Sequence, residues 1–162
     1  MAGQRPVDAP GVNIDALGFE LLSPAECRRL LAGTGIGRVG FHARALPRIL
    51  PVAFALDGDG IVVPVRAGSE LHGGLRDAVV AFEADGVGPG ENERWSVSVT
   101  GMATEMGEGA QLDRARGLLA DGCGPGVARF VRISLDLVTG RRGPVPAAWA
   151  VPGGEEGPRA AA

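Results

Sequence analysis

The chain has 162 residues, a length that fits one domain, and its 45% hydrophobic and 22% charged content is typical of a protein with a buried core. A formal net charge of -3 gives no basic surplus, which argues against nucleic acid as a partner. All 16 basic residues are arginine. Without lysine, covalent pyridoxal phosphate chemistry and a Walker-type phosphate loop are excluded.

Targeting and metal signals are missing from the sequence. No apolar run is long enough to cross a bilayer, and the N-terminal MAGQRPVDAPGVN lacks the apolar stretch of a secretory signal. We therefore expect a cytoplasmic protein with no membrane partner. The two cysteines, Cys27 and Cys123, are too few for a disulfide framework. Together with His42 and His72 they show no metal-ligand spacing, so no metal site is predicted.

The N-terminal part of the chain predicts an arm followed by a helix. Residues 1–18 are rich in Pro, Gly and Ala and are expected to form a flexible arm. Ser23 can cap a helix, Pro24 suits its first position, and Glu26 completes a capping box. The helix should run to about Ala32, with Cys27 on its buried side along with Leu30 and Leu31, and end in a glycine-rich stretch.

Six short strands are predicted, over 36–42, 48–56, 61–66, 78–84, 94–105 and 129–138. The second and third should form a hairpin around a tight turn at 57–60, and 85–93 should be a polar, glycine-rich loop. In 94–105, Trp95 alternates cleanly with polar residues. In the last strand, Val131, Ile133, Leu135 and Leu137 should share one face.

Two more helices are predicted, over 69–75 and 110–120. The second should turn Leu112, Ala115, Leu118 and Leu119 inward. From Gly143 the chain is Pro- and Gly-rich, and 143–162 is predicted to be a disordered tail.

These elements indicate a mainly β fold with short helices, a small and mostly antiparallel barrel. The strands at 48–56 and 78–84 are apolar on both faces. Because only one face of a barrel strand fills the interior, the other face needs a cover, and we expect a second copy of the chain to provide it.

A candidate phosphate site follows the third strand. Arg66 ends that strand, and the Gly68-Ser69 step opens a short helix. A guanidinium and free backbone N–H groups converge at such a place, which favours a phosphate-bearing cofactor.

The chain resembles the pyridoxamine 5'-phosphate oxidase-like family of FMN-binding split barrels. The resemblance covers roughly 21–142, and four pieces carry it in the expected order: LSPAECRRLLAGTGIGRVGF, LPRILPVAFALDGDGIVVPVRAGSEL, WSVSVTGMATEM and FVRISLDLVTGRR. It implies a six-stranded antiparallel split barrel, spanning 19–142, that forms a homodimer. It also implies noncovalent FMN, or a related deazaflavin, at two sites per dimer.

The resemblance assigns site residues as well. The strand around Arg48 would lie along the flavin ring, Arg66 and Ser69 would face the phosphate, and the Trp95 strand would lie near the dimer interface. The residues that it implies for cofactor binding are Arg48, Ile49, Leu50, Pro51, Val65, Arg66, Ser69, Trp95 and Ser96. No catalytic residue is assigned.

The resemblance makes a flavin-dependent oxidoreductase acting on an unidentified small molecule the leading hypothesis. Oxidation of pyridoxamine phosphate itself is not expected, since only Arg66 marks a phosphate site. Glu70 stands where the family usually has a lysine that pairs with the phosphate. The alternative is therefore a non-catalytic ligand-binding or interaction protein that has lost FMN. Haem binding through His42 or His72 is a weaker alternative.

Overall fold

The computed structural model describes residues 13–90, 93–120 and 129–144. They form nine strands and three helices. The strands are β1 (Glu20–Leu21), β2 (Ile36–Ala43), β3 (Leu46–Ala53), β4 (Ala55–Asp57), β5 (Gly60–Val65), β6 (Ala78–Val87), β7 (Glu93–Glu105), β8 (Arg129–Ser134) and β9 (Leu137–Pro144). The helices are α1 (Pro24–Ala32), α2 (Glu70–Leu75) and α3 (Ala110–Leu118). Among the described helices, none has the length and apolarity needed to cross a membrane.

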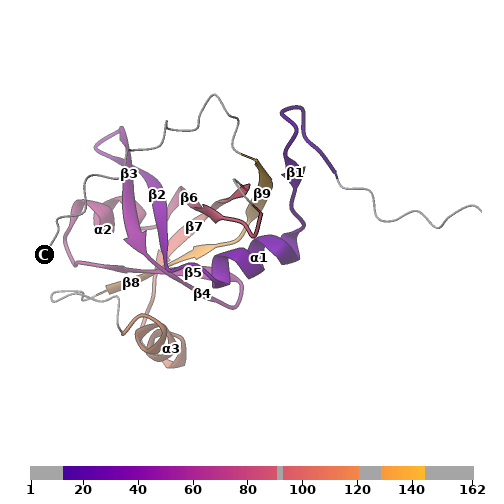
Figure 1. Ribbon diagram of the computed structural model, residues 1–162. Helices are drawn as coiled ribbons and strands as arrows, with labels where there is room; N and C mark the ends of the chain where they lie inside the picture. Colours follow the sequence, from indigo (N-terminus) through magenta and orange to yellow (C-terminus); the bar gives the residue numbers. More distant parts are fainter. Residues whose placement is uncertain (1–12, 91–92, 121–128, 145–162) are drawn as a thin grey trace, which may run out of the picture.

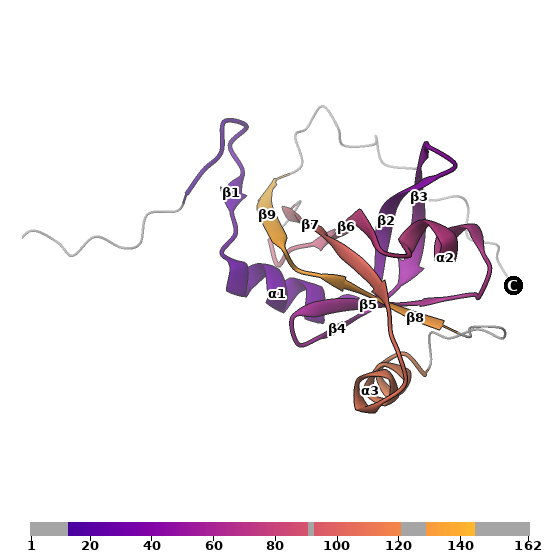
Figure 2. The same ribbon diagram turned by 180° about the vertical axis from the view of Figure 1, so that it is seen from behind.

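One curled antiparallel sheet makes up the body of the protein. Its strand order is β3-β2-β6-β7-β8-β5-β4, and β9 pairs with both β7 and β1. The first and last strands of this order, β3 and β4, are separated in the chain by Phe54 alone. The sheet must therefore curl until its two edges meet at that residue, as the two opposite views in Figures 1 and 2 show. The predicted mainly β, antiparallel split barrel is confirmed.

The strand count differs from the predicted six because two predicted strands are broken. The stretch 48–56 divides at Phe54 into β3, which pairs with β2, and β4, which pairs with β5. Phe54 is 2% exposed and packs edge-on against Phe82, with ring centroids 4.8 Å apart. Only β4 forms the predicted hairpin, which Asp57 and Gly60 close. The unpredicted two-residue β1 completes the nine.

The second break divides the predicted strand 129–138 into β8 and β9. The chain bends between them, and both pieces then pair with β7. At the bend, the Ser134 hydroxyl accepts a hydrogen bond from the Met102 N–H at 2.9 Å and donates one to the Asp136 carboxylate at 2.8 Å. Leu137, predicted to share the inner face of one long strand, is 59% exposed.

Other predicted boundaries shift by a few residues. The predicted loop 85–93 is shorter, since β6 extends to Val87 and β7 already begins at Glu93. At the N-terminus, the Asp15 carboxylate accepts the N–H groups of Leu17 and Phe19 at 2.8 and 2.9 Å, which folds a turn before β1. The predicted tail lies outside the described residues from position 145 onward.

Two hydrophobic clusters stabilise the sheet. The larger fills the barrel, and α1 and α2 contribute Cys27, Leu31 and Leu75 to it. The smaller lies outside β5 and β8, where Leu112 and other residues of α3 cover Val62. Figures 1 and 2 both show α3 beneath β4 and β8, apart from the other helices. Leu118 of α3, predicted to point inward, is 55% exposed.

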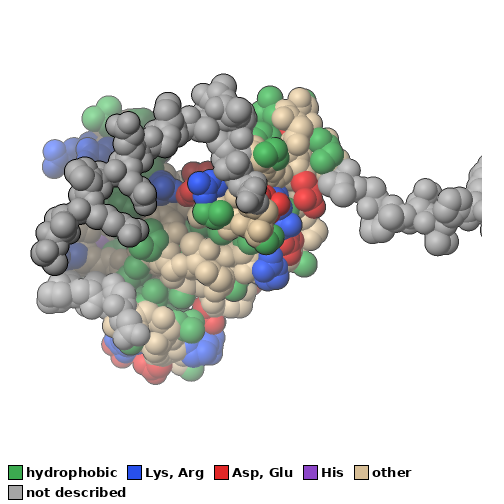
Figure 3. Space-filling model, viewed as in Figure 1, with side chains coloured by type: hydrophobic (Ala, Val, Ile, Leu, Met, Phe, Trp, Pro, Cys, Tyr) green, Lys and Arg blue, Asp and Glu red, His purple; other side chains and the backbone are tan. Residues whose placement is uncertain are grey.

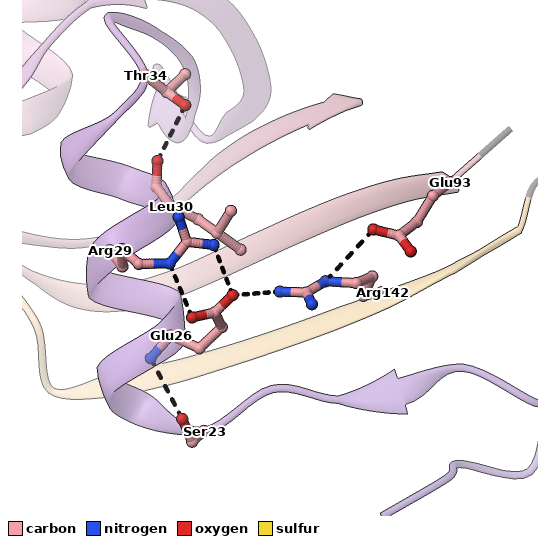
Figure 4. Close-up of polar contacts among 7 residues, drawn as sticks. All are labelled: Ser23, Glu26, Arg29, Leu30, Thr34, Glu93 and Arg142. Atoms are coloured by element: carbon pink, nitrogen blue, oxygen red, sulfur yellow. Dashed lines mark hydrogen bonds and ion pairs between the residues drawn. The ribbon is translucent and has the colours of Figure 1, made fainter. Parts of the chain in front are cut away.

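Helix α1 is fixed to the sheet by a cluster of charges, shown in Figure 4. The predicted cap is present, since the Ser23 hydroxyl accepts from the Glu26 N–H at 3.2 Å. The second half of the predicted capping box is replaced, because the Glu26 carboxylate accepts from Arg29 and from Arg142 of β9. Arg142 also lies 3.7 Å from Glu93 of β7. These contacts connect α1 to two strands.

This cluster makes stability dependent on pH at the acid side. The two guanidiniums, that of Arg29 first, lower the pKa of Glu26 from 4.5 to about 2. A carboxylate with a depressed folded-state pKa stabilises the protein above its unfolded pKa, and this contribution is lost as pH falls from about 4.5 toward 2. We expect the difference in unfolding free energy between the wild type and Glu26→Gln, measured by denaturant titration, to shrink over that range.

Asp113→Asn is the matched control, because among the described residues the exposed Asp113 carboxylate forms an ion pair with Arg116 alone, one turn along α3. A difference that stays constant between pH 6 and pH 2 for Glu26→Gln would contradict the prediction. The prediction would also be contradicted if the unfolding free energies of Glu26→Gln and Asp113→Asn, each relative to the wild type, depended equally on pH.

Gly101 of β7 is the second point on which the fold depends. A Cβ at this position would overlap the backbone carbonyl oxygen of Ser134, where β8 ends. We expect Gly101→Ala to lower the unfolding free energy by about 1–3 kcal/mol or more, the usual cost of overpacking. Gly117→Ala in α3 meets open space and should raise stability by up to about 1 kcal/mol, because alanine favours helix. Equal thermal midpoints for the two variants would contradict this assignment.

Candidate functional site

The predicted phosphate turn lies between β5 and α2. Arg66 is exposed, and its carbonyl accepts from the Ser69 N–H at 3.1 Å. Gly68 takes a φ of +74°, a conformation that favours glycine. The Ser69 hydroxyl caps α2 by accepting the His72 N–H at 3.1 Å. Since a hydroxyl also carries one donor, the Ser69 O–H is still available to an anion.

Strand β3 reaches this turn through one ion pair. The Arg48 guanidinium lies 3.3 Å from the Glu70 carboxylate, and both side chains are 48% exposed. Glu70, which the sequence placed in the position of a phosphate-binding lysine, is thus paired with a cation from another element. Arg48, Glu70 and Arg66 together carry a formal charge of +1. Two guanidiniums and a hydroxyl are donors that fit a phosphate, although Glu70 reduces the positive charge.

The remaining predicted residues of β3 lie along an edge of the sheet. The strand pairs with β2 on one side and ends the strand order on the other. Ile49 and Pro51 are exposed, and Leu50 is partly buried against the core. An edge strand offers backbone N–H and C=O groups that no neighbouring strand uses, which suits a planar heterocycle. Val65, predicted at the same site, is 2% exposed and belongs to the core.

Trp95 and Ser96 lie elsewhere, at a hollow of about 510 Å³. Trp95 is 7% exposed and packs across Gly86, where a Cβ would meet the indole ring at 2.7 Å. Charged side chains enter from β2 and β6, where Arg38 pairs with Asp85. Figure 3 shows basic and acidic side chains meeting in a recess of this face. Phe19, Arg94 and Arg141 also line the hollow.

The two groups of predicted residues are joined by β3. Arg48 contacts the phosphate turn, whereas Pro51 is the register partner of Arg38, which lines the Trp95 hollow. Three residues of a strand span about 10 Å. The structure therefore brings Arg48 beside Glu70, which directly follows the Arg66–Ser69 turn, and leaves Trp95 and Ser96 near the far end of β3.

The outer face of the sheet carries a row of uncharged residues across its middle. One row crosses five strands in register, and it consists of Ile49, Gly40, Ala81, Thr100 and Leu137. Ile49 and Leu137, at its two ends, are 71% and 59% exposed. Val79 and Met102, a register pair two residues along, are 62% and 42% exposed. Isolated apolar residues are common on surfaces, but a continuous row of this kind is typical of an interaction face.

The sequence did not point to the partners of His72. Its Nε2 lies 2.9 Å from the carboxylate of Glu105, at the end of β7, and its Nδ1 accepts from the Gly68 N–H at 3.1 Å. Both ring nitrogens are thus engaged, so an axial haem bond would have to displace one of them. His42 is exposed on β2. Among the described residues, which omit Cys123, no cluster of three or more His, Cys, Asp or Glu could hold a metal.

Comparison with known proteins places this geometry in a family. The family described as pyridoxamine 5'-phosphate oxidase matches residues 23–142. Protein Rv0080 of Mycobacterium tuberculosis is 35% identical over 122 residues, which are 72% of this chain and 80% of that protein.

Solved structures agree with this match. A FAD-binding protein from Mycobacterium smegmatis is 25% identical with a TM-score of 0.61, over 77% of this chain and 98% of that one. A FAD-binding protein from Mesorhizobium loti shares the fold, with a TM-score of 0.68 at 24% identity over 76% and 96% of the two chains. The chain therefore belongs to the pyridoxamine 5'-phosphate oxidase family of split-barrel proteins.

Proposed function

We propose that this protein is a flavin-dependent oxidoreductase that binds FMN noncovalently and acts on a small-molecule substrate. The observation that carries the proposal is the Arg48–Glu70 contact, which brings the edge strand β3 beside the Arg66–Ser69 turn. A ring along the strand and a phosphate at the turn would then be one ligand. Membership of the family and the FAD-binding description of the Mycobacterium smegmatis neighbour support a flavin as that ligand.

The protein's own residues would bind and orient the cofactor. Bound flavin supplies the hydride chemistry, while the protein supplies position and electrostatics. Arg66, Arg48 and the Ser69 hydroxyl would hold the phosphate, and the backbone of β3 would fix the ring.

Glu70 decides how tightly a phosphate is held. A carboxylate about 4 Å from a phosphate costs about 4 kcal/mol per charge pair at an effective dielectric constant of roughly 20. Arg48, at 3.3 Å from Glu70, offsets much of that repulsion. The phosphate monoester of FMN carries close to two charges at neutral pH, whereas each phosphate of FAD or of a deazaflavin phosphodiester carries one. Glu70 therefore weakens the binding of the FMN phosphate more than that of a singly charged phosphate, and Arg48, by neutralising Glu70, keeps the site open to FMN.

A homodimer would complete the site. A second copy would cover the outer face that carries the uncharged row across β3, β2, β6, β7 and β9. The flavin would then lie at the margin of this face, along β3. The Trp95 hollow lies at the opposite end of the same face. An antiparallel pairing of two such faces would bring the hollow of one protomer toward the phosphate turn of its partner.

The alternative is a ligand-binding or interaction protein in which Glu70 has abolished flavin binding. An absorption spectrum of the freshly purified protein, followed by FMN titration, separates the two. Flavin bands or saturable FMN binding support the oxidoreductase. A colourless protein that binds neither FMN, FAD nor the deazaflavin would overturn it in favour of the alternative, and a Soret band would indicate haem.

Opposite changes at the phosphate turn should shift FMN affinity in opposite directions. Arg66→Ala removes a charge-assisted hydrogen bond of roughly 1.5–3 kcal/mol, so we expect binding to weaken about 10- to 150-fold. Glu70→Lys replaces repulsion by attraction and should tighten binding about tenfold or more. Fluorescence titration with FMN gives both dissociation constants.

Glu108→Lys and Arg116→Ala are the matched controls. They make the same changes in net charge at exposed positions beside or on α3. If the controls and the site variants shift FMN affinity equally, the effect comes from overall charge and the phosphate site is misplaced.

A substitution at the centre of the uncharged row tests whether the protein forms the proposed dimer. Ala81→Glu places a carboxylate where two outer faces would meet, and we expect it to convert a dimer into a monomer and to weaken FMN binding. Ala110→Glu, at the exposed first residue of α3, is the control and should stay dimeric. Light scattering that shows a stable wild-type monomer at micromolar concentration would exclude the dimer.

A further inference from the structure

The side chain of His72 connects the phosphate turn to the last residue of β7, Glu105. Its Nδ1 accepts the Gly68 N–H at 3.1 Å, and its Nε2 lies 2.9 Å from the Glu105 carboxylate. A backbone N–H can only donate, so Nδ1 must be unprotonated. The neutral ring therefore carries its proton on Nε2 and donates it to Glu105.

Glu105 is itself held from two sides. Its second oxygen accepts from Arg129 of β8 at 2.9 Å. The hydrogen bond from His72 is the main reason why the pKa of Glu105 lies below its usual range, and Arg129 and Arg76 add to the effect. A continuous chain of contacts thus runs from β8 through β7 and the imidazole to the Gly68 amide.

This geometry distinguishes between two roles for the histidine. A general base needs a free nitrogen facing the substrate, but both nitrogens of His72 are engaged and its side chain is only 12% exposed. His72 instead closes the turn twice, since its own N–H donates to the Ser69 hydroxyl while its ring accepts from Gly68. Its position is that of a support for the residues that would meet the ligand.

We propose that His72 is a positioning residue that, as a neutral imidazole, holds the Arg66–Ser69 turn closed for the flavin phosphate, and that protonation of its Nδ1 releases the turn. The inference rests on the proposed function. On protonation, an Nδ1–H would face the Gly68 N–H, so two donors would oppose each other and the contact would be lost. Arg66 and Ser69 would then lose their alignment.

Charged groups from several elements lie near the His72 ring. The ring faces the Glu105 carboxylate of β7, and the charges of Arg129 on β8 and of Arg76 at the end of α2 contribute to the lowered pKa of that carboxylate. Glu70 and Arg48 already neutralise each other. Neither β2 nor β6, the other strands packed on α2, brings a charged side chain into contact with the ring in the described residues.

The first test needs no flavin. In the dimeric or monomeric protein as purified, nitrogen NMR of the two histidines reports protonation and tautomer from pH 8 to pH 5. We expect His72 to show the Nε2–H form at pH 8 and the Gly68 amide to shift with the same midpoint as the His72 ring. His42, exposed on β2, is the internal control and should titrate without moving Gly68. An Nδ1–H tautomer, or a Gly68 amide that ignores the titration, would overturn the proposal.

The second test uses FMN. His72→Gln can satisfy either Gly68 or Glu105 but not both, so FMN should bind about tenfold more weakly at pH 8, the equivalent of one lost hydrogen bond. Protonation of the FMN phosphate affects every variant alike. The informative quantity is therefore the difference between His72→Gln and the control His42→Gln, which should narrow as pH falls from 8 to 5.

A further variant keeps the proposal falsifiable if His72→Gln folds poorly. Glu105→Gln removes the carboxylate that faces Nε2 of His72, so the pH at which the Gly68 amide shifts should change, and it should still equal the midpoint of the His72 ring. If the amide follows His72 but no variant binds FMN, the proposed function fails and the turn-holding role stands. If FMN binds with the same pH profile in His72→Gln and His42→Gln, the role of His72 fails and the proposed function stands.

Discussion

The structure depends on one strand, β7, which is hydrogen-bonded along both edges. On one side it pairs with all ten residues of β6. On the other side it pairs first with β9 and then with β8, which come from one stretch of chain bent at Ser134. The close approach at Gly101 lies where the partner changes. Because backbone groups in a sheet need partners, this arrangement fixes where the barrel curls and where it ends.

The candidate site follows from the same constraint. The strand order places β3 and β4 at its two ends, so one edge of β3 pairs with no other strand of the described chain. The end of β7 supplies Glu105, which supports the phosphate turn through His72. A rigid central strand thus positions a ligand site that lies at the margin of the sheet, through side chains of modest individual strength.

Local signals in the sequence were enough for most elements. Ser23 and Pro24 marked the start of α1, Ser69 marked α2, and the alternation around Trp95 marked β7. The breaks at Phe54 and at Ser134 were missed because an apolar alternating run looks the same whether it pairs with one strand or with two. Strand pairing is decided by residues that are distant in the chain, as when the Met102 N–H donates a hydrogen bond to the Ser134 hydroxyl.

The site could be predicted only in part for the same reason. Arg66 and Ser69 are close together in the chain, so a local motif was sufficient to predict that they share one turn, as they do in the structure. The pairing of Arg48 with Glu70, and of His72 with Glu105, joins residues more than 20 positions apart. No spacing rule reports such contacts. The burial of the Val65 side chain was not evident from the sequence because β5 shows no alternation, with α3 covering one face and the barrel interior the other.

The ion pairs that join α1 to β9, β2 to β6 and β8 to β7 all use arginine, and the chain contains no lysine. Hydrogen bonds to Glu26 and Asp85 raise the pKa of Arg29 and of Arg38 further above the value for a free guanidinium. A lysine in these places would begin to lose its proton above about pH 10. These ion pairs of the barrel therefore keep their charges in alkaline solution in which lysine would lose its proton. Reagents that acylate side-chain amines do not modify them.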